Sequence, residues 1–397
     1  MTPTPAASVE TGPAILVVDD VEANRDALAR RLRRRGYTVI EAAGGREALG
    51  LIATGTFDLV LLDVMMPDVN GLDVLRAVRK ERSAVELPVI MATARAEGSD
   101  VVEALQLGAN DYVTKPLDFP VVFARVQTQL DLRRAVRRAL ELEKRLARDL
   151  KAAARIQESL LPREFAPPPG WSVAWAFRPC DELAGDALNV CQLDGDHIAM
   201  YVLDVTGHGV APALLAVTVT RVLSPAAGQE SLLLQPGDGA THVVPPAAVA
   251  DRLALQFPFD SHTELFFTLA YAVLDVPKKA LRYVSAGHPP GVVVPADGSP
   301  PRFLPGTGLP VGLGTGYEEH TLPLATGDRV YWYSDGVPEA SEKGGELFGN
   351  DRLLALLAAA RGEPLAASVT RLETEVMAWC GATHPRDDVS ILAVEVG

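Results

Sequence analysis

The first third of the chain places acidic side chains where short apolar runs end. AILVVDD closes with Asp19 and Asp20, and FDLVLLD closes with Asp63. Three carboxylates that share one site repel one another and raise each other's pKa unless a cation joins them. Oxygen ligands of this kind suit Mg²⁺. A carboxylate held beside Mg²⁺ is a competent nucleophile toward phosphorus and would form an acyl phosphate.

Two further polar residues follow later apolar runs and could act on the same phosphoryl group. Thr93 ends LPVIMATA, and Lys115 stands between GANDYVT and Pro116. A hydroxyl and an ammonium group would hydrogen-bond to the new phosphoryl oxygens. The alternative, that these strand-end acids only cap helices, is reasonable for any one of them. It does not explain why all these groups follow successive strands, where open sheets carry their sites.

A second set of acids follows apolar runs in the last half of the chain. Asp186 lies in ELAGDAL, Asp204 in VLDVTGHG, Asp335 in YWYSDGV and Asp387 in HPRDDVSIL. Four carboxylates delivered by strands can hold one or two hard divalent ions. Two such ions about 3.5–4 Å apart can share a hydroxide and clamp the oxygens of an in-line displacement at phosphorus.

Other interpretations of this second set are weaker. The turn after Asp204, Gly-His-Gly, could be a plain tight turn, or part of a dinucleotide fingerprint. However, Pro212 stands where that fingerprint requires its third glycine, and no parallel strand-helix-strand unit follows. Cys180, Cys191 and Cys380 have no metal-ligand spacing and no phosphate loop around them, so they are expected to be reduced core thiols.

The elements that must position the first set are short apolar strands alternating with helical segments over residues 14–131. Continuous apolar strands separated by helices predict a doubly wound, five-stranded parallel sheet that is covered on both faces. The carboxyl ends of such strands share one edge, where ligands bind. The acids of the first set are therefore expected to meet.

Residues 166–397 follow a different pattern. Strands rich in Val, Tyr, Phe and Trp succeed one another like hairpins, and helices are interleaved with them. This pattern predicts a layered α+β domain with antiparallel sheets. Residues 224–246 have no firm periodicity and are expected to form a mobile loop.

Between the two domains, residues 132–165 are predicted to form a helical connector. Apolar residues recur there at alternating spacings of four and three, which favours a coiled-coil seam and a homodimer. Glu143 and Gln157 interrupt the stripe, and the Pro-rich LLPREFAPPPG ends the helix. The basic residues on one flank are interpreted as a solvated face; docking of an acidic partner or a protein substrate is the alternative. The stripe consists of Leu132, Val136, Ala139, Glu143, Leu146, Leu150, Ala153, Gln157 and Leu160.

Composition narrows the classes of protein that fit. The chain has 397 residues, enough for two or three domains, and a formal net charge of −14, so nucleic acid is a poor partner. Residues 1–13 lack the basic and apolar regions of a signal peptide and are expected to be a disordered tail. No apolar run is long enough for a membrane span, so a cytoplasmic protein is expected.

Residues 14–131 resemble a response-regulator receiver domain at every position of that family's motif. The resemblance implies that Asp63 accepts a phosphoryl group from a histidine kinase or another donor. It implies that Asp19, Asp20, Asp63 and the carbonyl group of Met65 bind Mg²⁺. It also implies the remaining motif roles: Thr93 as the switch hydroxyl, Tyr112 as the mobile aromatic residue, and Lys115 with Pro116 as the closing pair.

Residues 166–397 resemble the bacterial PPM-type (PP2C-like) serine/threonine phosphatases of the SpoIIE and RsbU kind. The resemblance is carried by AGD, DVTGHG, SAGHPP, YSDGVPEA and RDDVSIL in this order. It implies an α-β-β-α sandwich with two Mn²⁺ or Mg²⁺ ions. The implied metal-site residues are Asp186, Asp204, the Val205 carbonyl, Asp335 and Asp387, with Gly336 and Asp388 beside them.

The chain departs from that family's pattern in two places. Its first motif is Ala184-Gly185-Asp186-Ala187-Leu188-Asn189, where the family has Gly-Gly-Asp-Phe-Tyr-Asp. Thr206 stands where eukaryotic relatives have a histidine that can protonate the leaving group. His208 is then either a general acid or a structural residue of the turn. Arg178 and His288 are interpreted as structural or phosphate-adjacent.

The expected function is hydrolysis of phosphoserine or phosphothreonine on a partner protein, under control of Asp63 phosphorylation. Family analogy suggests an anti-sigma-factor antagonist as that partner. A non-catalytic scaffold remains an alternative because the first motif is altered. It would have to keep clustered carboxylates without a metal, which is costly. A metal-dependent nucleotide hydrolase is a third possibility, without a supporting motif.

Overall fold

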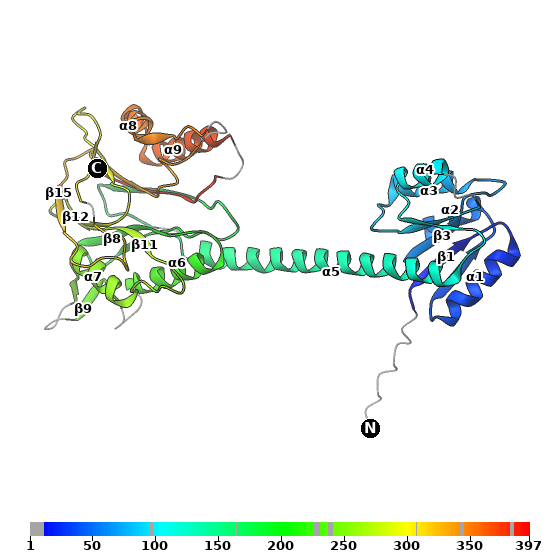
Figure 1. Cartoon of the computed structure of the whole chain (residues 1–397). Helices are drawn as coiled ribbons and strands as arrows, with labels where there is room; N and C mark the ends of the chain where they lie inside the picture. Colours follow the sequence, from blue (N-terminus) through cyan, green and yellow to red (C-terminus); the bar gives the residue numbers. More distant parts are fainter. Residues whose placement is uncertain are drawn as a thin grey trace, which may run out of the picture. The chain divides into compact units, whose positions relative to one another are not determined.

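The computed structural model divides the chain into two compact units, residues 1–146 and 147–397 (Figure 1). The first eleven residues of the expected tail lie outside the described residues. No helix within the described ranges is both long and apolar enough to cross a membrane. The structure describes residues 12–94, 98–162, 165–225, 231–236, 241–306, 308–341, 345–381 and 385–397.

The first unit contains a five-stranded parallel sheet of order β2-β1-β3-β4-β5, as predicted. The three central strands are apolar and buried along most of their length because helices cover both faces, and one apolar core lies on each face. The strands are β1 Ala14–Val18, β2 Thr38–Ala42, β3 Leu59–Asp63, β4 Val89–Thr93 and β5 Asp111–Thr114. The first four helices are α1 Glu22–Arg34, α2 Gly45–Thr54, α3 Gly71–Glu81 and α4 Gly98–Gln106.

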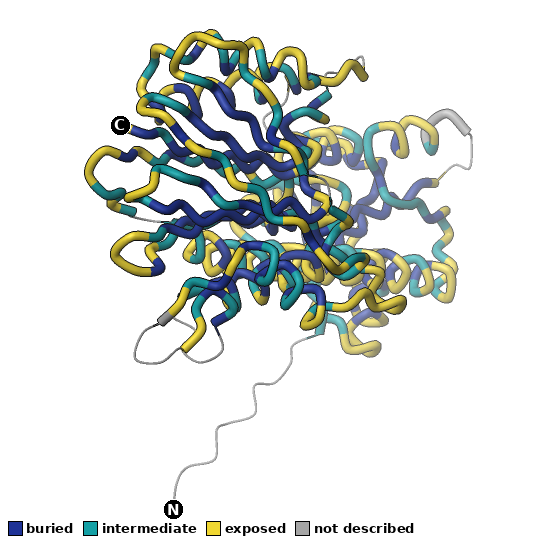
Figure 2. The backbone as a smooth tube through the Cα atoms, turned by 90° about the vertical axis from the view of Figure 1, so that its left-hand side faces the viewer, coloured by how far each residue is buried: buried dark blue, intermediate teal, exposed yellow. Residues whose placement is uncertain are grey.

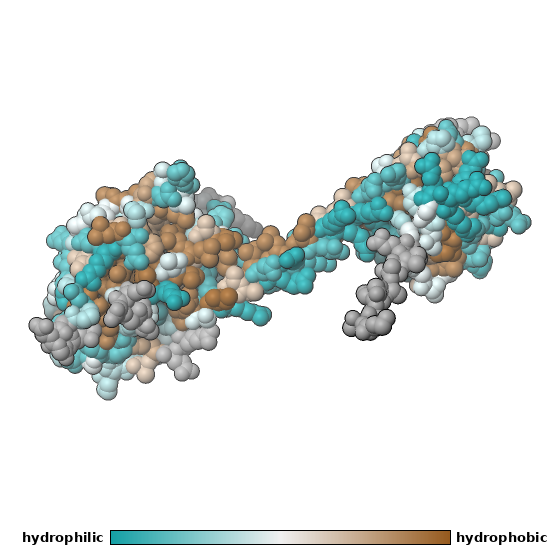
Figure 3. Space-filling model, turned by 90° about the horizontal axis from the view of Figure 1, so that it is seen from below, coloured by the Kyte–Doolittle hydropathy of each residue, from teal (hydrophilic) through white to brown (hydrophobic). Residues whose placement is uncertain are grey.

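Helix α5, Phe119–Glu158, begins inside the range expected for the first domain and includes most of the expected connector. Its first turns are attached to α1 by two cation–π contacts: Arg31 lies over Phe119, and Arg35 lies over Phe123. Arg133 also pairs with Asp58 of the first unit. The base of α5 is therefore packed as part of the receiver-like unit. Figure 3 shows both hydrophobic and hydrophilic side chains along the helix.

The second unit contains two five-stranded antiparallel sheets. Their orders are β15-β12-β11-β8-β7 and β14-β13-β16-β17-β6. The first sheet consists of β7 Ala187–Gln192, β8 His197–Val205, β11 Phe267–Asp275, β12 Ala280–Ala286 and β15 His320–Pro323. The second consists of β6 Trp171–Arg178, β13 Val292–Val294, β14 Arg302–Phe303, β16 Arg329–Tyr333 and β17 Val389–Val396.

Helices cover the outer faces of both sheets, which gives the predicted four layers. Helices α6 and α7 pack on β7, β8, β11 and β12, while α8 and α9 pack on the sheet that contains β16 and β17. A third core lies between the two sheets. Figure 2 shows the strands as mostly buried and the connecting loops as mostly exposed. The helices are α6 Val210–Val222, α7 Pro246–Gln256, α8 Gly349–Ala359 and α9 Leu365–Cys380, with a 3₁₀ turn at Ala360–Gly362.

Side chains alternate between two cores along β8. Tyr201, Leu203 and Val205 face the helices, whereas Met200 and Val202 face the other sheet. This alternation follows from the two-residue period of a strand. Asp204 has the same parity as Val202, so its carboxylate emerges on the side between the two sheets.

Residues 224–246 differ from the expected mobile loop. Their described part includes a two-stranded antiparallel hairpin, β9 Leu234–Pro236 with β10 Thr241–Val243. Leu233 and Val244 beside it are buried in the core under α6 and α7. The strands are too short to give a periodic signal, and their apolar residues are separated by turn residues. The remainder of this stretch, residues 226–230 and 237–240, lies outside the described residues.

Candidate functional site

The strand-end acids of the first unit meet at one edge of the sheet. One carboxylate oxygen from each of Asp19, Asp20 and Asp63 lies within 4.8 Å of the other two. Asp19 and Asp63 are buried, whereas Asp20 is exposed. The Lys115 Nζ atom lies 2.8 Å from an oxygen of Asp19 and 2.8 Å from an oxygen of Asp63. The parallel register therefore brings together groups that are far apart in the sequence.

The electrostatics of this cluster favour a bound cation. Burial raises the pKa of Asp63, and Asp19 adds repulsion, while the hydrogen bond and charge of Lys115 lower it. Burial opposes the charge of Lys115, but the two carboxylates outweigh it and its pKa is raised. Asp63 thus sits between a lysine and two acids, and the set of oxygen donors fits Mg²⁺.

The other predicted receiver residues lie on neighbouring strands. Thr93 is buried at the end of β4, and its carbonyl group accepts a hydrogen bond of 2.7 Å from the Lys115 backbone. Tyr112 lies on β5, with the Arg125 guanidinium 5.4 Å from its ring centre. Met65 has an exposed side chain, and its backbone hydrogen bond to Asp63 lowers the pKa of that carboxyl group.

In the second unit, all four predicted acids lie at strand ends. Asp204 is the penultimate residue of β8, and Asp186 immediately precedes β7 in the same sheet. Asp335 follows β16, and Asp387 precedes β17, both in the opposite sheet. The two sheets therefore supply the acids from opposite sides of one gap.

Burial, and then repulsion from neighbouring carboxylates, raises the pKa of each of these four acids. Burial, and then repulsion from Asp335, Asp387 and Asp388, raises the pKa of Asp204 to about 7. Burial and Asp387 raise the pKa of Asp335 to about 6. Burial also raises the pKa of Asp387, and burial with Asp204 raises that of Asp186. Desolvated carboxylates in this arrangement fit divalent cations, which would relieve the repulsion.

Asp388 has a different environment from Asp387. Its carboxylate accepts hydrogen bonds from the backbone N–H groups of Cys180 (2.8 Å), Gly185 (2.7 Å) and Asp186 (3.2 Å). These bonds fix the loop that carries Asp186. Gly336 is required nearby, because a Cβ atom there would lie 2.0 Å from the Asp388 carbonyl oxygen. Asp388 is thus suited to holding the backbone of Gly185 and Asp186 in place.

Two serines that the sequence did not single out complete this arrangement. The Ser390 hydroxyl donates a 2.6 Å hydrogen bond to Asp186 across the gap between the sheets. The Ser334 hydroxyl donates to the Asp388 carbonyl (3.1 Å) and accepts from the Ser390 backbone (3.0 Å). Their only sequence signal is that they lie close to acids: Ser334 adjoins Asp335, and Ser390 stands two residues after Asp388.

His208 and Arg178 lie on the surface of the second unit. The His208 side chain is 76% exposed, and its Nδ1 atom lies 3.5 Å from Asp181. Arg178 pairs with Glu373 and lines a cavity of about 560 Å³. This cavity is lined by Lys151, Arg178, Pro179, Cys180, Asp181, Glu182 and Pro385. Cys180, expected in the core, is half-buried there beside Asp387 and Asp388.

Gln157 of α5 is joined to the loop that carries Asp186. Its amide nitrogen donates to the Ala184 carbonyl (2.6 Å), and its amide oxygen accepts from the Ala184 backbone N–H (3.1 Å). Gln157 is only 8% exposed. In the sequence, Gln157 interrupts the predicted apolar stripe of the connector. The structure shows that it pairs with a backbone two residues from Asp186.

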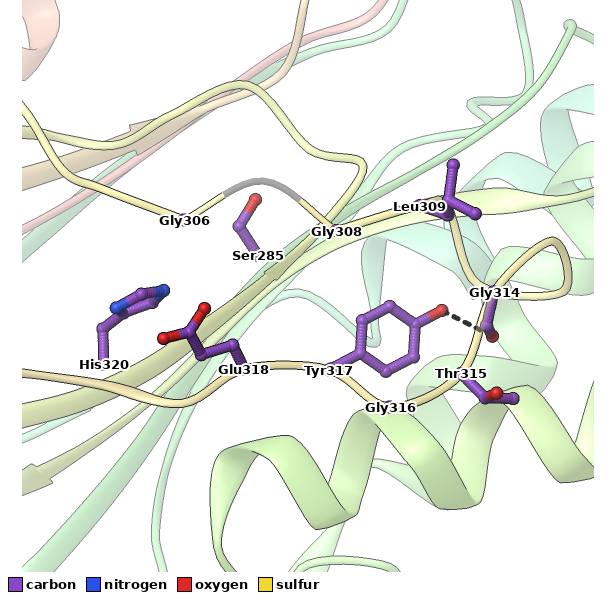
Figure 4. A pocket seen from close by; sticks show the side chains of 10 residues that line it. All are labelled: Ser285, Gly306, Gly308, Leu309, Gly314, Thr315, Gly316, Tyr317, Glu318 and His320. Carbon is purple, nitrogen blue, oxygen red and sulfur yellow. Dashed lines mark hydrogen bonds between the residues drawn. The ribbon is translucent and has the colours of Figure 1, made fainter.

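A separate cavity of about 280 Å³ lies under the loop between β14 and β15 (Figure 4). Tyr317 closes one end by donating a 3.0 Å hydrogen bond to the Gly314 carbonyl. The four acids of the second unit do not belong to its described lining. It is lined by Ser285, Gly306, Gly308, Leu309, Gly314, Thr315, Gly316, Tyr317, Glu318 and His320.

Fold and site together define a receiver domain followed by a PPM-type phosphatase domain. Comparison with known proteins agrees with this class: the model of the Stage II sporulation protein E (SpoIIE) family matches residues 194–397, and that of the response regulator receiver domain matches residues 15–127. The chain belongs to the SpoIIE family and carries a response-regulator receiver domain at its amino-terminal side.

Individual relatives match one domain each. The SiaA-PP2C domain of Pseudomonas aeruginosa is 22% identical, with a TM-score of 0.55 over 64% of this chain and 99% of that one, a likeness of fold. AfsQ1, a transcriptional regulatory protein of Streptomyces coelicolor, is 41% identical over 118 residues, or 30% of this chain and 51% of its own. YkoG of Bacillus subtilis is 45% identical over 116 residues, 29% of this chain and 50% of its own. The chain thus spans about half the length of these curated relatives.

Proposed function

We propose that the protein is a metal-dependent serine/threonine phosphatase whose turnover is controlled by phosphorylation of Asp63. The observation that carries this proposal is the placement of four strand-end acids between two sheets, where burial and then repulsion from neighbouring carboxylates raise their pKa values. Asp186, Asp204, Asp335 and Asp387, with the Val205 carbonyl, would hold two Mn²⁺ or Mg²⁺ ions. When bound, such ions supply a hydroxide nucleophile and neutralise charge on the phosphoryl oxygens.

The chain's own residues give this site its geometry. Asp388 fixes the backbone before Asp186, and Ser390 orients the Asp186 carboxylate by donating a hydrogen bond. Gly185 allows a close approach, since a Cβ atom there would lie 2.8 Å from the Val205 carbonyl oxygen. His208 lies too far into solvent to serve as a buried acid, so we assign it no proton transfer.

The receiver domain would supply the control. Asp63 would accept a phosphoryl group from a histidine kinase or another donor, with Asp19, Asp20 and the Met65 carbonyl holding Mg²⁺ beside it. Lys115 would move from its carboxylate pairs to the new phosphoryl oxygens. The Thr93 hydroxyl would donate a hydrogen bond to the same phosphoryl group, and the ring of Tyr112 would move together with Thr93.

Helix α5 is the proposed carrier of the signal. Its base packs on the receiver through Arg31 and Arg35, and its last turn holds Ala184 through Gln157. A shift or rotation of α5 would therefore move the backbone next to Asp186. We also propose that the apolar stripe of the connector, residues 132–165, pairs two copies of the chain.

The proposed substrate is phosphoserine or phosphothreonine on a partner protein of the anti-sigma-factor-antagonist type. This assignment rests on membership of the SpoIIE family. We further propose that the receiver spans residues 14–131 and the phosphatase domain residues 166–397.

The test is turnover of p-nitrophenyl phosphate by the full chain with Mn²⁺, beside the Asp335→Asn variant. Each protein is measured with and without beryllofluoride, an acyl-phosphate mimic for Asp63. Turnover that requires Asp335 and changes with beryllofluoride supports a receiver-controlled phosphatase. Absence of turnover, together with Mn²⁺ binding that is equal in the parent chain and in Asp335→Asn, contradicts the proposal and favours a scaffold that recruits partners.

A further inference from the structure

His288 lies in the segment that connects the two sheets of the phosphatase domain. The chain leaves β12 at Ala286, passes through Gly287-His288-Pro289-Pro290-Gly291, and enters β13 in the opposite sheet. His288 is only 4% exposed. A histidine buried this deeply is costly unless its ring nitrogens have polar partners.

The partners of His288 come from both sheets. Its Nδ1 atom forms a 2.8 Å hydrogen bond with the hydroxyl of Thr268 on β11. Its other polar neighbour is the backbone of Tyr333, the last residue of β16, although Nε2 makes no hydrogen bond of standard geometry among the described contacts. The Ser285 hydroxyl donates to the His288 carbonyl (3.0 Å), and Tyr333 donates its hydroxyl to Pro290 (2.8 Å). Thr268 therefore holds the ring, while the other two hydrogen bonds hold the backbone of the segment that carries it.

The two residues that contact the imidazole, Thr268 and Tyr333, lie close to proposed metal ligands. Thr268 lies directly opposite Asp204 in the antiparallel pairing of β11 with β8, so the two side chains are neighbours on one face. Tyr333 stands two residues before Asp335. One imidazole thus lies between the strand beside Asp204 and the strand that leads to Asp335.

Neutral imidazole suits this place, because it offers one acceptor and one donor in opposite directions. The Thr268 hydroxyl can donate to Nδ1 while the Nε2–H group faces the Tyr333 backbone. An apolar ring of the same size would fill the volume but would leave the Thr268 hydroxyl without this partner.

We propose that His288 is a positioning residue that sets the separation of Asp204 and Asp335 across the two sheets. The inference rests on the proposed metal-dependent function, and it assigns His288 no contact with substrate. A change of a few tenths of an ångström between ligands from opposite sheets alters how well two ions fit, because ligand geometry controls their affinity.

The decisive variants are Thr268→Val, which keeps the shape and removes the hydroxyl, and Thr268→Ser, which keeps the hydroxyl. His288→Asn and His288→Phe probe the ring itself. The parent for these measurements is the full chain with Asp19→Asn and Asp20→Asn, which removes the divalent-cation site of the receiver. Its Mn²⁺ affinity is measured from free Mn²⁺ by electron paramagnetic resonance, and its melting temperature is measured in chelator. We expect about tenfold weaker Mn²⁺ binding for Thr268→Val and His288→Phe, on the scale of outer-shell substitutions. Thr268→Ser should remain close to the parent. The melting temperature of Thr268→Val should fall by a few degrees, because the buried Nδ1 atom of His288 loses its partner, but the variant should remain folded at the temperature of the titration.

The inference is overturned if Thr268→Val binds Mn²⁺ as the parent chain does, or if Thr268→Ser, which keeps the hydroxyl, loses as much affinity as Thr268→Val. In the first case the parent still binds Mn²⁺, so the proposed phosphatase function stands. If the parent chain itself binds no Mn²⁺, both the proposed function and the role of His288 are wrong.

Discussion

At the scale of single residues, Asp204 shows the burial and the charge repulsion that characterise the proposed phosphatase site. It is largely removed from water, and three other acids raise its pKa to about 7. The folded chain therefore binds a proton at Asp204 more readily than the unfolded chain does, because the carboxylate is penalised only in the fold. The residue that would serve as a metal ligand is also a source of instability when no cation is bound.

This raised pKa predicts an unusual pH dependence of stability in chelator. Stability contributed by a group with a raised folded pKa is present at low pH and is lost as the pH rises through that pKa. We expect the second unit to melt at least about 2 °C higher at pH 6.5 than at pH 8, as measured by calorimetry of the full chain. Burial lowers the pKa of His288 to about 3. His288 therefore reduces the stability of the fold only below about pH 6.5, where the histidine of the unfolded chain becomes protonated.

The matched control for this measurement is Asp204→Asn, which removes the titrating group and keeps its shape. A pH dependence that is equal in the parent chain and in Asp204→Asn would contradict the assignment to Asp204.

A second prediction at the scale of single residues concerns the phosphorylation of Asp63. With acetyl phosphate and Mg²⁺, the parent chain should incorporate one acid-labile phosphoryl group, as measured by mass spectrometry and phosphate-affinity electrophoresis. Asp63→Asn should reduce incorporation to background, because an amide is not a nucleophile toward phosphorus. Asp73→Asn is the control, since Asp73 is an exposed acid of the same unit. Equal labelling of Asp63→Asn would place the acceptor elsewhere.

At the scale of elements, the ends of β16 and β17 approach each other so closely that Gly336 has no room for a side chain. An added Cβ atom would meet the Asp388 carbonyl oxygen at 2.0 Å, and backbone cannot yield as a flexible side chain does. Gly336→Ala should therefore destabilise the chain by about 1–3 kcal/mol, measured by urea unfolding. Gly195→Ala is the control, because a Cβ atom there meets nothing within 4 Å. Equal stability of the two variants would refute the close approach.

Much of this element structure is predictable from the sequence. Strands such as β8 and β16 are long apolar runs, so their type and their terminal acids could be read directly. Strand β7, ALNVCQ, mixes polar and apolar residues and was missed because its pairing with β8 depends on distant contacts. The roles of Asp388, Ser390 and Gln157 were not predictable, since each depends on a partner that only the fold brings near.

At the scale of the whole molecule, the first turns of α5 pack on the receiver domain, and its last turn contacts the loop that carries Asp186 of the proposed phosphatase site. Gln157→Leu should leave Asp63 phosphorylation intact but abolish most of the change in turnover that beryllofluoride causes, because the two hydrogen bonds to Ala184 are lost. The measurement is the ratio of turnover with and without beryllofluoride. Gln127→Leu is the control, as an exposed glutamine of the same helix. An unchanged ratio in Gln157→Leu would mean that α5 signals by another contact.

The alternating side chains of β8 have a consequence for how this protein can change over generations. Asp204, Val202 and Met200 share one parity, and the residues between them face the helices. Deleting a single residue within β8 would turn Asp204 toward the helices and bring a valine into the gap. Inherited insertions and deletions of odd length should therefore be excluded from β8 and tolerated in the turns that lie away from the acids. Related chains should vary in the length of those turns while keeping the spacing from Ile198 to Asp204 constant.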